Sequence, residues 1–465
     1  MVEDVYPLAP MQQGILFHVL EAPDDAGMYV AQEVYEFAGA LDVAALRQAW
    51  DVVVARHAAL RTAFVWEGVA KPLQVVHADV AVPFELLDWS ADAEADEAAQ
   101  RARLDELLRL DRERGFDVTS PPLARVHVVD RGGDRFWMVW TFHHICADGW
   151  SVSLVVNEVS QAYEASCRGG RVELPAVRPF RDFVAWLAER DAVEAEEFWR
   201  SYLAGFEAAT LLPVDRPAAG RHGVQDFRRL ELSREVTAGL VRLARRARVT
   251  LGTVVQAGWA LLLSRYSGER DVVFGLTVSG RPVELAGMES MVGLFINTLP
   301  VRTRVPVDVP FVEWLRQLQD SQMAMRRFEY TPLADIQRCS EVPRGASLFD
   351  SVMVFGNYPD DEIPEGADLP GDVATVFTPL KSVELANYPI MIAVELRDRL
   401  EMEMEFSTAA FDGATVERLL EQFEWVLRVV AGGGGVLVRD VGLGELVSGW
   451  GMGGVVSGEV VGVHR

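Results

Sequence analysis

The sequence predicts a mixed α/β fold in which helices pack on strands. Segments with apolar residues at helical spacing alternate along the chain with strand-like runs. The chain has 465 residues, of which 50% are hydrophobic, so it is too long for one ordinary core and can fill two. Both halves carry helices and strands in a similar order, which hints at an internal duplication. We therefore expect two domains or lobes.

The clearest pattern is the stretch RFWMVWTFHHICADGWS at residues 135–151. Strand alternation separates its side chains into two faces, Phe136, Met138, Trp140, Phe142 and His144 against Trp137, Val139, Thr141 and His143. Both faces are largely apolar, so this strand should be central in its sheet. His143 and His144 cannot enter one cavity unless the strand breaks between them. We expect one reactive and one structural histidine.

The segments before this strand predict a core helix, several strands and a surface helix. Asp42 is the expected N-cap of a helix over 43–59, which carries one apolar stripe. Strand-like runs follow at residues 62–66, 71–89 and 123–130. Residues 91–113 are highly charged with interleaved leucines, which is typical of an amphipathic surface helix. Gly132 and Gly133 predict a hairpin turn into the central strand.

The segments after the strand predict an amphipathic helix from about Ser151 to Cys167 and then a second half that begins with a proline-rich boundary near 174–180. The later predicted elements are helices at 180–205, 234–267, 311–328 and 414–431, strands at 228–233, 271–280, 349–357, 382–396 and 399–407, and a polar loop at 358–375. We predict lobes at residues 1–175 and 176–431, followed by a Gly/Val-rich linker at 432–465 toward a further domain.

Composition excludes several classes of protein. Lysine and arginine number 44 against 69 acidic residues, a net charge of −25, which argues against nucleic acid and other polyanions as partners. The three cysteines are widely spaced, which argues against a disulfide framework or a metal site and fits a reducing cytoplasm. The N-terminus lacks the pattern of a signal peptide, and the longest apolar helix candidate, at 253–266, is too short to span a bilayer.

The motif HHICADG at 143–149 matches HHxxxDG, the signature of the condensation domains of nonribosomal peptide synthetases, within the chloramphenicol acetyltransferase-like superfamily. Six further blocks resemble motifs of that family in the family's order: APMQQGILF at 9–17, RHAALRTAF at 56–64, FRDFVAWL at 180–187, VGLFINTLPVR at 292–302, FEYTPLADIQ at 328–337 and ASLFDSVMVFGNYP at 346–359. The resemblance implies two chloramphenicol acetyltransferase-like lobes that form a V-shaped pseudo-dimer, with mixed sheets flanked by helices.

This resemblance also implies a reaction from antibiotic and other secondary metabolite biosynthesis. The amine of an acceptor aminoacyl thioester attacks a donor acyl or peptidyl thioester, and His144 positions the amine and accepts its proton. Both substrates arrive on phosphopantetheine arms of upstream and downstream carrier domains, so no cofactor is expected to be bound intrinsically. We further expect an adenylation domain to follow, a cytoplasmic location, no membrane contact, and an isolated domain that is monomeric.

The remaining motif residues receive expected roles from the same resemblance. His143 should orient the loop by hydrogen bonds, and Asp148 should pair with Arg61. Gly149 either relieves crowding at the substrate path or supplies a positive φ. Trp150 belongs to the core or to the wall of a tunnel, and Asn297 is either the polar end of a crossing loop or a tunnel residue. Cys146 is expected to be a packed thiol, since the motif requires no residue type at its position.

Three rival functions share parts of this pattern. An epimerisation domain shares HHxxxDG, but DGWSVSLVVNE at 148–158 resembles condensation domains more closely. A non-catalytic recruitment module of the same fold usually loses the second histidine or the aspartate, and both are retained here. A free-standing acyltransferase that uses coenzyme A needs a basic pocket, which the acidic composition disfavours. The segment after the motif leans slightly toward an L-configured donor, while the substrate side chains cannot be read from the sequence.

Overall fold

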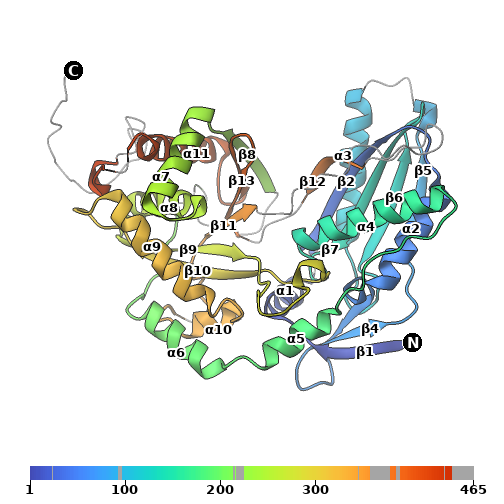
Figure 1. The fold of residues 1–465 in the computed structure, drawn as a ribbon, viewed down its shortest axis with the longest axis horizontal. Helices are drawn as coiled ribbons and strands as arrows, with labels where there is room; N and C mark the ends of the chain where they lie inside the picture. Colours follow the sequence, from blue (N-terminus) through green and yellow to red (C-terminus); the bar gives the residue numbers. More distant parts are fainter. Residues whose placement is uncertain are drawn as a thin grey trace. The chain divides into compact units, whose positions relative to one another are not determined.

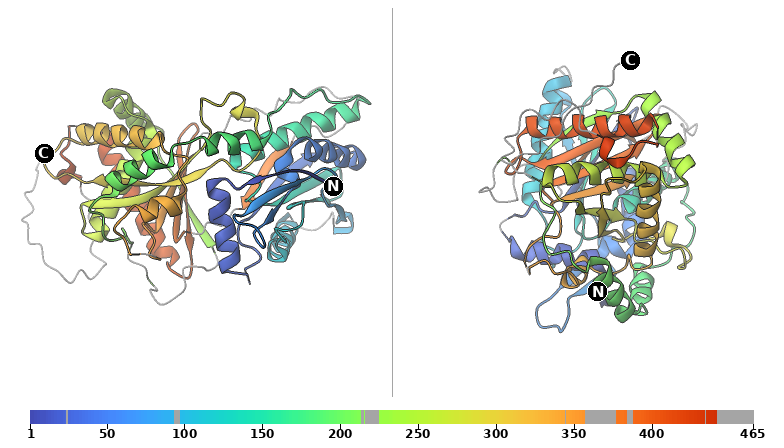
Figure 2. Two further views of the ribbon diagram at one scale, coloured as in Figure 1. Left: turned by 90° about the horizontal axis from the view of Figure 1, so that it is seen from below. Right: turned by 90° about the vertical axis from the view of Figure 1, so that its left-hand side faces the viewer.

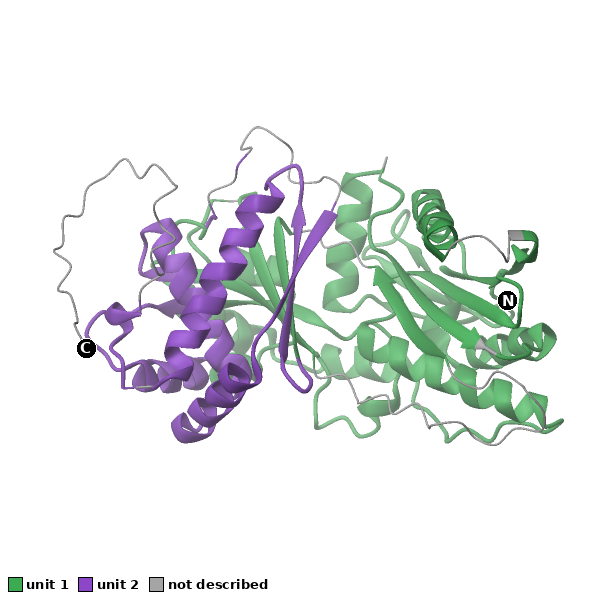
Figure 3. Ribbon diagram, turned by 90° about the horizontal axis from the view of Figure 1, so that it is seen from above, with its two compact units in different colours: residues 1–210, 273–302, 323–395 green, residues 211–272, 303–322, 396–465 purple. Residues whose placement is uncertain are grey.

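A computed structural model of the chain describes residues 1–23, 25–92, 97–212, 215, 225–343, 345–356, 377–383, 388–433 and 435–441. The chain forms two compact units (Figure 3). Unit 1 comprises Met1–Thr210, Val273–Arg302 and Met323–Glu395, and unit 2 comprises Leu211–Val272, Thr303–Gln322 and Leu396–Arg465. These units are not the sequential segments 1–175 and 176–431, because residues 176–210 and two later segments pack with the first part of the chain.

A five-stranded sheet in unit 1 has the strand order β12-β2-β7-β6-β5. Its strands are β2 (Val30–Ala38), β5 (Phe84–Asp88), β6 (Ala124–Asp130), β7 (Arg135–His143) and β12 (Thr378–Val383). Strand β7 is central and antiparallel to both β2 and β6, as its two apolar faces predict (Figure 1). The β6–β7 hairpin turns through Gly132 and Gly133, both with positive φ, which confirms the predicted turn.

Helices cover both faces of this sheet. On one face, α2 (Val43–Arg56) and α4 (Gly149–Cys167) pack side by side and share a core with Met138, Trp140 and Phe142 (Figures 1 and 2). On the other face, α3 (Glu97–Arg114) packs its leucines against Trp137 and Val139. Asp42 caps α2 by accepting hydrogen bonds from the backbone N–H groups of Ala44 and Ala45, as predicted. Both faces of β7 are therefore buried.

Unit 1 also contains strands and helices outside the five-stranded sheet and its covering helices. A three-stranded sheet has the order β1-β4-β3, with β1 (Val2–Pro7), β3 (Thr62–Val65) and β4 (Leu73–His77). Four further strands lie mostly in this unit in the order β10-β9-β11-β13: β9 (Asp271–Val278), β10 (Asn297–Arg304), β11 (Ser351–Gly356) and β13 (Ile390–Leu396). The helices are α1 (Pro10–Glu21), α5 (Phe180–Ala188), α6 (Ala192–Leu203) and α10 (Leu333–Arg338).

Unit 2 combines helices with an antiparallel pair of strands, β8 (Gln225–Glu231) and β14 (Leu400–Ser407). Its helices are α7 (Arg234–Ala247), α8 (Leu251–Ser267), α11 (Gly413–Ala431) and most of α9 (Phe311–Arg326). Residues 435–441, which the sequence placed in a linker, pack on this unit: Leu437 forms a β-bridge with Pro310, and Val438 and Val441 are buried. The linker prediction is therefore wrong for this stretch, and residues 442–465 lie outside the described residues.

One predicted strand serves two sheets. Residues 382–396 look continuous in sequence, but β12 pairs with β2 while β13 pairs with β11 in a different sheet. The predicted loop at 358–375 lies outside the described residues. The mixed α/β class, with sheets flanked by helices, is as predicted.

Candidate active site

The two adjacent histidines lie at the break between strand β7 and the turn that follows it. Strand β7 ends at His143, which is 2% exposed, and His144 begins the turn and is half-buried. The strand thus ends between the two histidines, so their side chains need not point to opposite faces as neighbouring strand residues do. Of the two imidazoles, that of His144 is the more accessible.

His143 is held as a neutral, buried imidazole. Burial, together with charge repulsion from the neighbouring His144, lowers its pKa to about 3. The backbone N–H of Ile145 donates to its Nδ1 at 3.2 Å, so the ring carries its proton on Nε2. The ring also lies beside the aromatic rings of Tyr29 and Phe116. The hydrogen bond from Ile145 ties the His143 ring to the turn, and the loop-orienting role of His143 stays a prediction.

The turn after His143 is held through its main chain. The N–H of His144 donates to the carbonyl oxygen of Tyr29 at 2.8 Å. Gln12, buried on α1, donates from Nε2 to the carbonyl oxygen of Ile145 at 3.1 Å, and a hydrogen bond from Gln74 Nε2 to Gln12 Oε1 at 2.9 Å orients that amide. Because these partners come from separate elements, the backbone that carries His144 is fixed from both sides of the turn.

Asp148 closes the turn and begins helix α4. Its side chain accepts from the N–H of Ser151 at 2.9 Å, as an N-cap, and from the N–H of Phe295 at 3.0 Å. Arg281 Nη2 donates to Asp148 Oδ1 at 3.1 Å. The backbone N–H of Asp148 donates to the carbonyl oxygen of Gly293. This buried carboxylate therefore has both a cationic partner and hydrogen-bond donors, as the sequence required.

The predicted partner of Asp148 is wrong: the arginine is Arg281 and not Arg61. Arg61 instead pairs with Glu3 and donates from Nε to the carbonyl oxygen of Val54 at 3.0 Å. Arg61 lies in a 3₁₀ turn directly after α2, and these contacts use its guanidinium there. The sequence did not predict a site role for Arg281, because this residue lies outside the block at 292–302. It directly precedes Pro282, a position that indicates a turn but no function.

Arg281 gathers several groups around Asp148. Its guanidinium also donates to Ser151 Oγ and to the carbonyl oxygen of Met291, and it lies 4.0 Å from the centre of the Phe295 ring. Burial lowers its pKa, while the charge of Asp148 opposes that shift. The charge is therefore retained inside the protein by an ion pair and by main-chain acceptors.

Ser151 and Gly293 tie helix α4 to the segment before β10. Ser151 Oγ donates to the carbonyl oxygen of Gly293 at 2.8 Å and accepts from the Gly293 N–H at 3.1 Å. A Cβ on Gly293 would lie 2.1 Å from the ring of Phe180, so only glycine fits. The blocks around residues 148, 180 and 293 thus meet in one cluster, although each is remote from the others in sequence.

The remaining predicted site residues receive clear positions. Gly149 is the first residue of α4 and has helical backbone, so the positive φ alternative is wrong. Trp150 is half-buried and donates from Nε1 to the carbonyl oxygen of Glu289 at 3.0 Å. Asn297 is buried and donates from Nδ2 to the carbonyl oxygens of Glu329 and Thr331, at 2.7 Å each. These contacts make Asn297 a structural clamp, and tunnel roles for Trp150 and Asn297 stay predictions.

Cys146 lies inside the motif as a packed thiol. It is buried with Ile145 and Leu294, and burial raises its pKa to about 12. The thiolate that a nucleophile requires is therefore disfavoured, as the sequence suggested. Among the described residues, no group of three His, Cys, Asp or Glu side chains could hold a metal ion.

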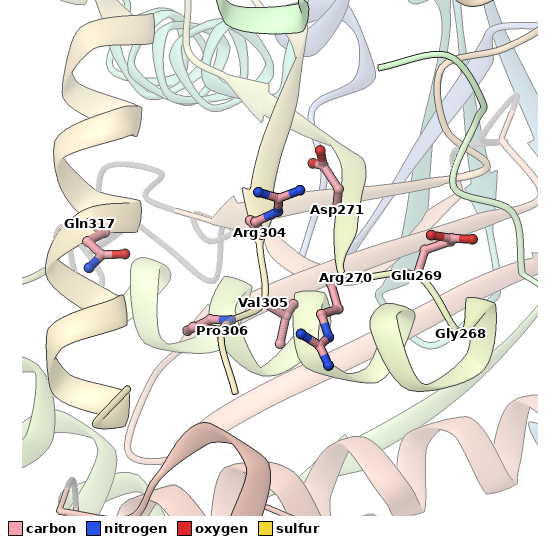
Figure 4. Close-up of a pocket in the computed structure, with 8 residues that line it drawn as sticks. All are labelled: Gly268, Glu269, Arg270, Asp271, Arg304, Val305, Pro306 and Gln317. Carbon is pink, nitrogen blue, oxygen red and sulfur yellow. The ribbon is translucent and has the colours of Figure 1, made fainter. Parts of the chain in front are cut away.

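A hollow in the described part of the chain lies elsewhere, within unit 2 (Figure 4). It measures about 520 Å³ and is lined by Gly268, Glu269, Arg270, Asp271, Arg304, Val305, Pro306 and Gln317. None of these residues belongs to the motif, and acidic and basic side chains are mixed. We therefore assign it no part in the candidate site.

Among the described helices, none combines the length and the hydropathy that a bilayer-spanning segment requires.

Comparisons with known proteins agree with the motif. The family profile of the Condensation domain matches residues 2–443. A linear gramicidin synthase protein of Brevibacillus parabrevis is 41% identical over 432 residues, which cover 92% of this chain and 8% of that protein. Bacitracin synthase 3 of Bacillus licheniformis is 34% identical over 95% of this chain and 7% of its own length. The chain thus spans less than a tenth of either of these two relatives.

Solved structures show the same fold. The X-domain from teicoplanin biosynthesis has a TM-score of 0.78 and 26% identity, covering 93% of this chain and 96% of that one. The first condensation domain of the calcium-dependent antibiotic synthetase, in complex with substrate analogue 2a, has a TM-score of 0.74 and 22% identity, covering 95% and 100%. The chain therefore belongs to the condensation domain family, whose members in nonribosomal peptide synthetases catalyse amide bond formation.

Proposed function

We propose that this domain forms a peptide bond between two carrier-bound thioesters, with His144 as the residue that positions the acceptor amine and accepts its proton. The observation that carries this proposal is the placement of His144. This residue is half-buried, and its backbone N–H donates to the carbonyl oxygen of Tyr29 at 2.8 Å. Its neighbour His143 is buried and neutral. Only one of the two rings is therefore available to substrates.

The chemistry asks for a modest base. An α-amine has an unperturbed pKa of about 7.7 to 8.0, so a useful fraction is already neutral near neutral pH. As nitrogen attacks the thioester carbonyl, the C–N bond forms, the carbonyl becomes an oxyanion and the amine becomes cationic. Neutral His144 hydrogen-bonds the amine and takes one of its protons. The C–S bond of the intermediate then breaks, and the thiolate of the donor arm leaves and takes up that proton, which returns His144 to its neutral form. The phosphopantetheine arms therefore enter the reaction as parts of the two substrates. Alignment of these two tethered substrates accounts for most of the rate enhancement.

The residues around His144 support the reaction without touching the reacting atoms. His143 holds the turn through the Ile145 N–H, and Asp148 holds the end of the turn to Arg281. In this proposal both are positioning residues. The buried thiol of Cys146 takes no part, because its raised pKa keeps it protonated.

The test is dipeptide formation between two loaded carrier proteins, followed by intact-protein mass spectrometry. We expect His144→Ala to slow product formation by about 10² to 10⁴-fold with the fold intact. His77→Ala, at a half-buried histidine on β4, is the matched control and should keep wild-type turnover. Wild-type turnover in His144→Ala would overturn the proposal.

Two rivals make different products in the same assay. An epimerisation domain would invert the α-carbon of a single loaded carrier without forming an amide. A recruitment module would give neither product; a similar structure, the X-domain of teicoplanin biosynthesis, is known in complex with OxyB, with 26% identity to this chain. Retention of His144 and Asp148 favours condensation. Loading the donor carrier with L- or D-aminoacyl groups in parallel measures the donor preference, for which we expect the L form.

A further inference from the structure

Tyr29 has an unusual backbone for a bulky residue. Its φ is +59°, and the only other non-glycine residues with positive φ among those described are Asp134 and Arg248. Asp134 lies in the β6–β7 hairpin turn and Arg248 ends helix α7, where a left-handed residue is common. Tyr29 is the third residue of a turn in which the Val30 N–H donates to the carbonyl oxygen of Gly27 at 3.2 Å, directly before strand β2, and a left-handed conformation is disfavoured for its bulky side chain. A strained backbone conformation of this kind persists only where the surrounding structure enforces it.

The conformation of Tyr29 directs its carbonyl group at the motif. Strands β2 and β7 pair antiparallel, with Val30 opposite His143 as the last pair of the ladder. One residue beyond that pair, the Tyr29 carbonyl oxygen accepts the N–H of His144 at 2.8 Å. The contact thus continues the ladder past the end of the strand and fixes the first residue of the turn, which carries the accessible imidazole.

The side chain of Tyr29 is anchored at the same time. Its hydroxyl lies 2.5 Å from Nδ1 of His18 on α1, and its ring is parallel to the His18 ring at 6.0 Å between centres. The same ring lies 6.3 Å from that of His143. The contact with His18 therefore fixes the Tyr29 side chain to helix α1. The left-handed backbone of the same residue accepts the hydrogen bond from the His144 N–H.

We propose that Tyr29 is a positioning residue for His144, an inference that rests on the proposed function. Productive geometry must be held within about 0.5 Å, and a displacement of about 1 Å can cost about a hundredfold in rate. His144 lies past the end of its strand, so its backbone needs a partner outside β7. The Tyr29 carbonyl supplies that partner, and the anchored side chain keeps the carbonyl in place.

The main test variant is Tyr29→Asn, because asparagine adopts positive φ readily but lacks the anchored ring. We expect kcat for dipeptide formation to fall about tenfold with KM for both carriers unchanged. Tyr29→Phe removes only the hydroxyl contact with His18 and should lower kcat by about two- to tenfold. The matched controls Asp134→Asn and Arg248→Asn change the other two left-handed positions and should leave kcat unaltered.

A double-mutant cycle separates positioning from a general effect on folding. In a His144→Ala background, Tyr29→Asn should cause no further loss, because the residue acts only through His144. Wild-type kcat in Tyr29→Asn and Tyr29→Phe, or an equal loss with and without His144, overturns the inference and leaves the proposed function standing. Full turnover in His144→Ala alone overturns both. If Tyr29→Asn does not fold, Tyr29→Phe decides by the same cycle.

Discussion

Arg281 and Asp148 form a buried ion pair although 133 positions separate them in the sequence. Arg281 Nη2 lies 3.1 Å from Asp148 Oδ1, and the two side chains are 6% and 1% exposed. The carboxylate also caps helix α4, and the guanidinium also holds main-chain carbonyl groups. The pair thus joins the end of the motif turn to the segment before β10.

Removing either partner of this pair should destabilise the protein. We expect Arg281→Met and Asp148→Asn each to lower the free energy of unfolding by about 3–5 kcal/mol, because a charged or polar group stays buried without its partner. Urea denaturation followed by tryptophan fluorescence measures the loss. The control is Arg181→Met, whose pair with Asp4 has the same 3.1 Å distance but side chains that are 59% and 30% exposed, and we expect a change of about 0–1 kcal/mol. Equal losses in Arg281→Met and Arg181→Met would contradict this role.

Ser151 should contribute more than its neighbour on the same helix. Ser151→Ala removes both hydrogen bonds with Gly293 and the one from Arg281, and we expect a loss of about 1–3 kcal/mol. Ser153→Ala removes a single contact to the Gly149 carbonyl oxygen at 3.5 Å and should change stability by about 0.5 kcal/mol or less. The same urea titration compares the two variants. Similar midpoints would argue against a stabilising role for the hydrogen bonds between Ser151 and Gly293.

Gly293 should not tolerate a side chain. Gly293→Ala places a Cβ 2.1 Å from the Phe180 ring, so we expect a loss of about 1–3 kcal/mol from overpacking. Phe180→Leu in the same chain should restore part of that loss. Gly14→Ala is the matched control within helix α1: a Cβ there meets nothing within 4 Å, and stability should rise by about 0.5–1 kcal/mol. Thermal melting monitors all three, and a neutral Gly293→Ala would contradict the packing argument.

The sequence predicts those parts of the site that depend on local pattern. The alternation in residues 135–143 predicts a central strand, and two glycines predict its hairpin, because burial and turn chemistry act over a few residues. The break after His143 is local in the same sense. The motif order then predicts which histidine faces substrates.

Contacts between remote segments could not be predicted in this way. The choice of Arg281 over Arg61 depends on how the segment before β10 packs on α4, which no local pattern encodes. The left-handed Tyr29 was missed for a related reason, since tyrosine gives no signal of positive φ. The strand prediction at 382–396 failed because the chain changes sheets within one apolar run.

His143 should make stability depend on pH below neutrality. Its folded pKa, about 3, lies below the ordinary value of 6.5, so the unfolded state binds a proton first as pH falls. The contribution is fully present above about pH 6.5 and is lost toward pH 3, at about 1.4 kcal/mol per pH unit. Glu329 acts oppositely, because burial raises its pKa to about 7 and its contribution is lost as pH rises through that value.

The two residues can be separated by substitution. We expect His143→Asn, whose amide oxygen can still accept the Ile145 N–H, to lose less stability than wild type between about pH 7 and pH 5. Glu329→Gln should lose more than wild type over the same interval, because it removes the group that favours the folded state in acid. Urea unfolding at the two pH values measures both differences. If His143→Asn and wild type lose stability equally, His143 is not held neutral in the folded state.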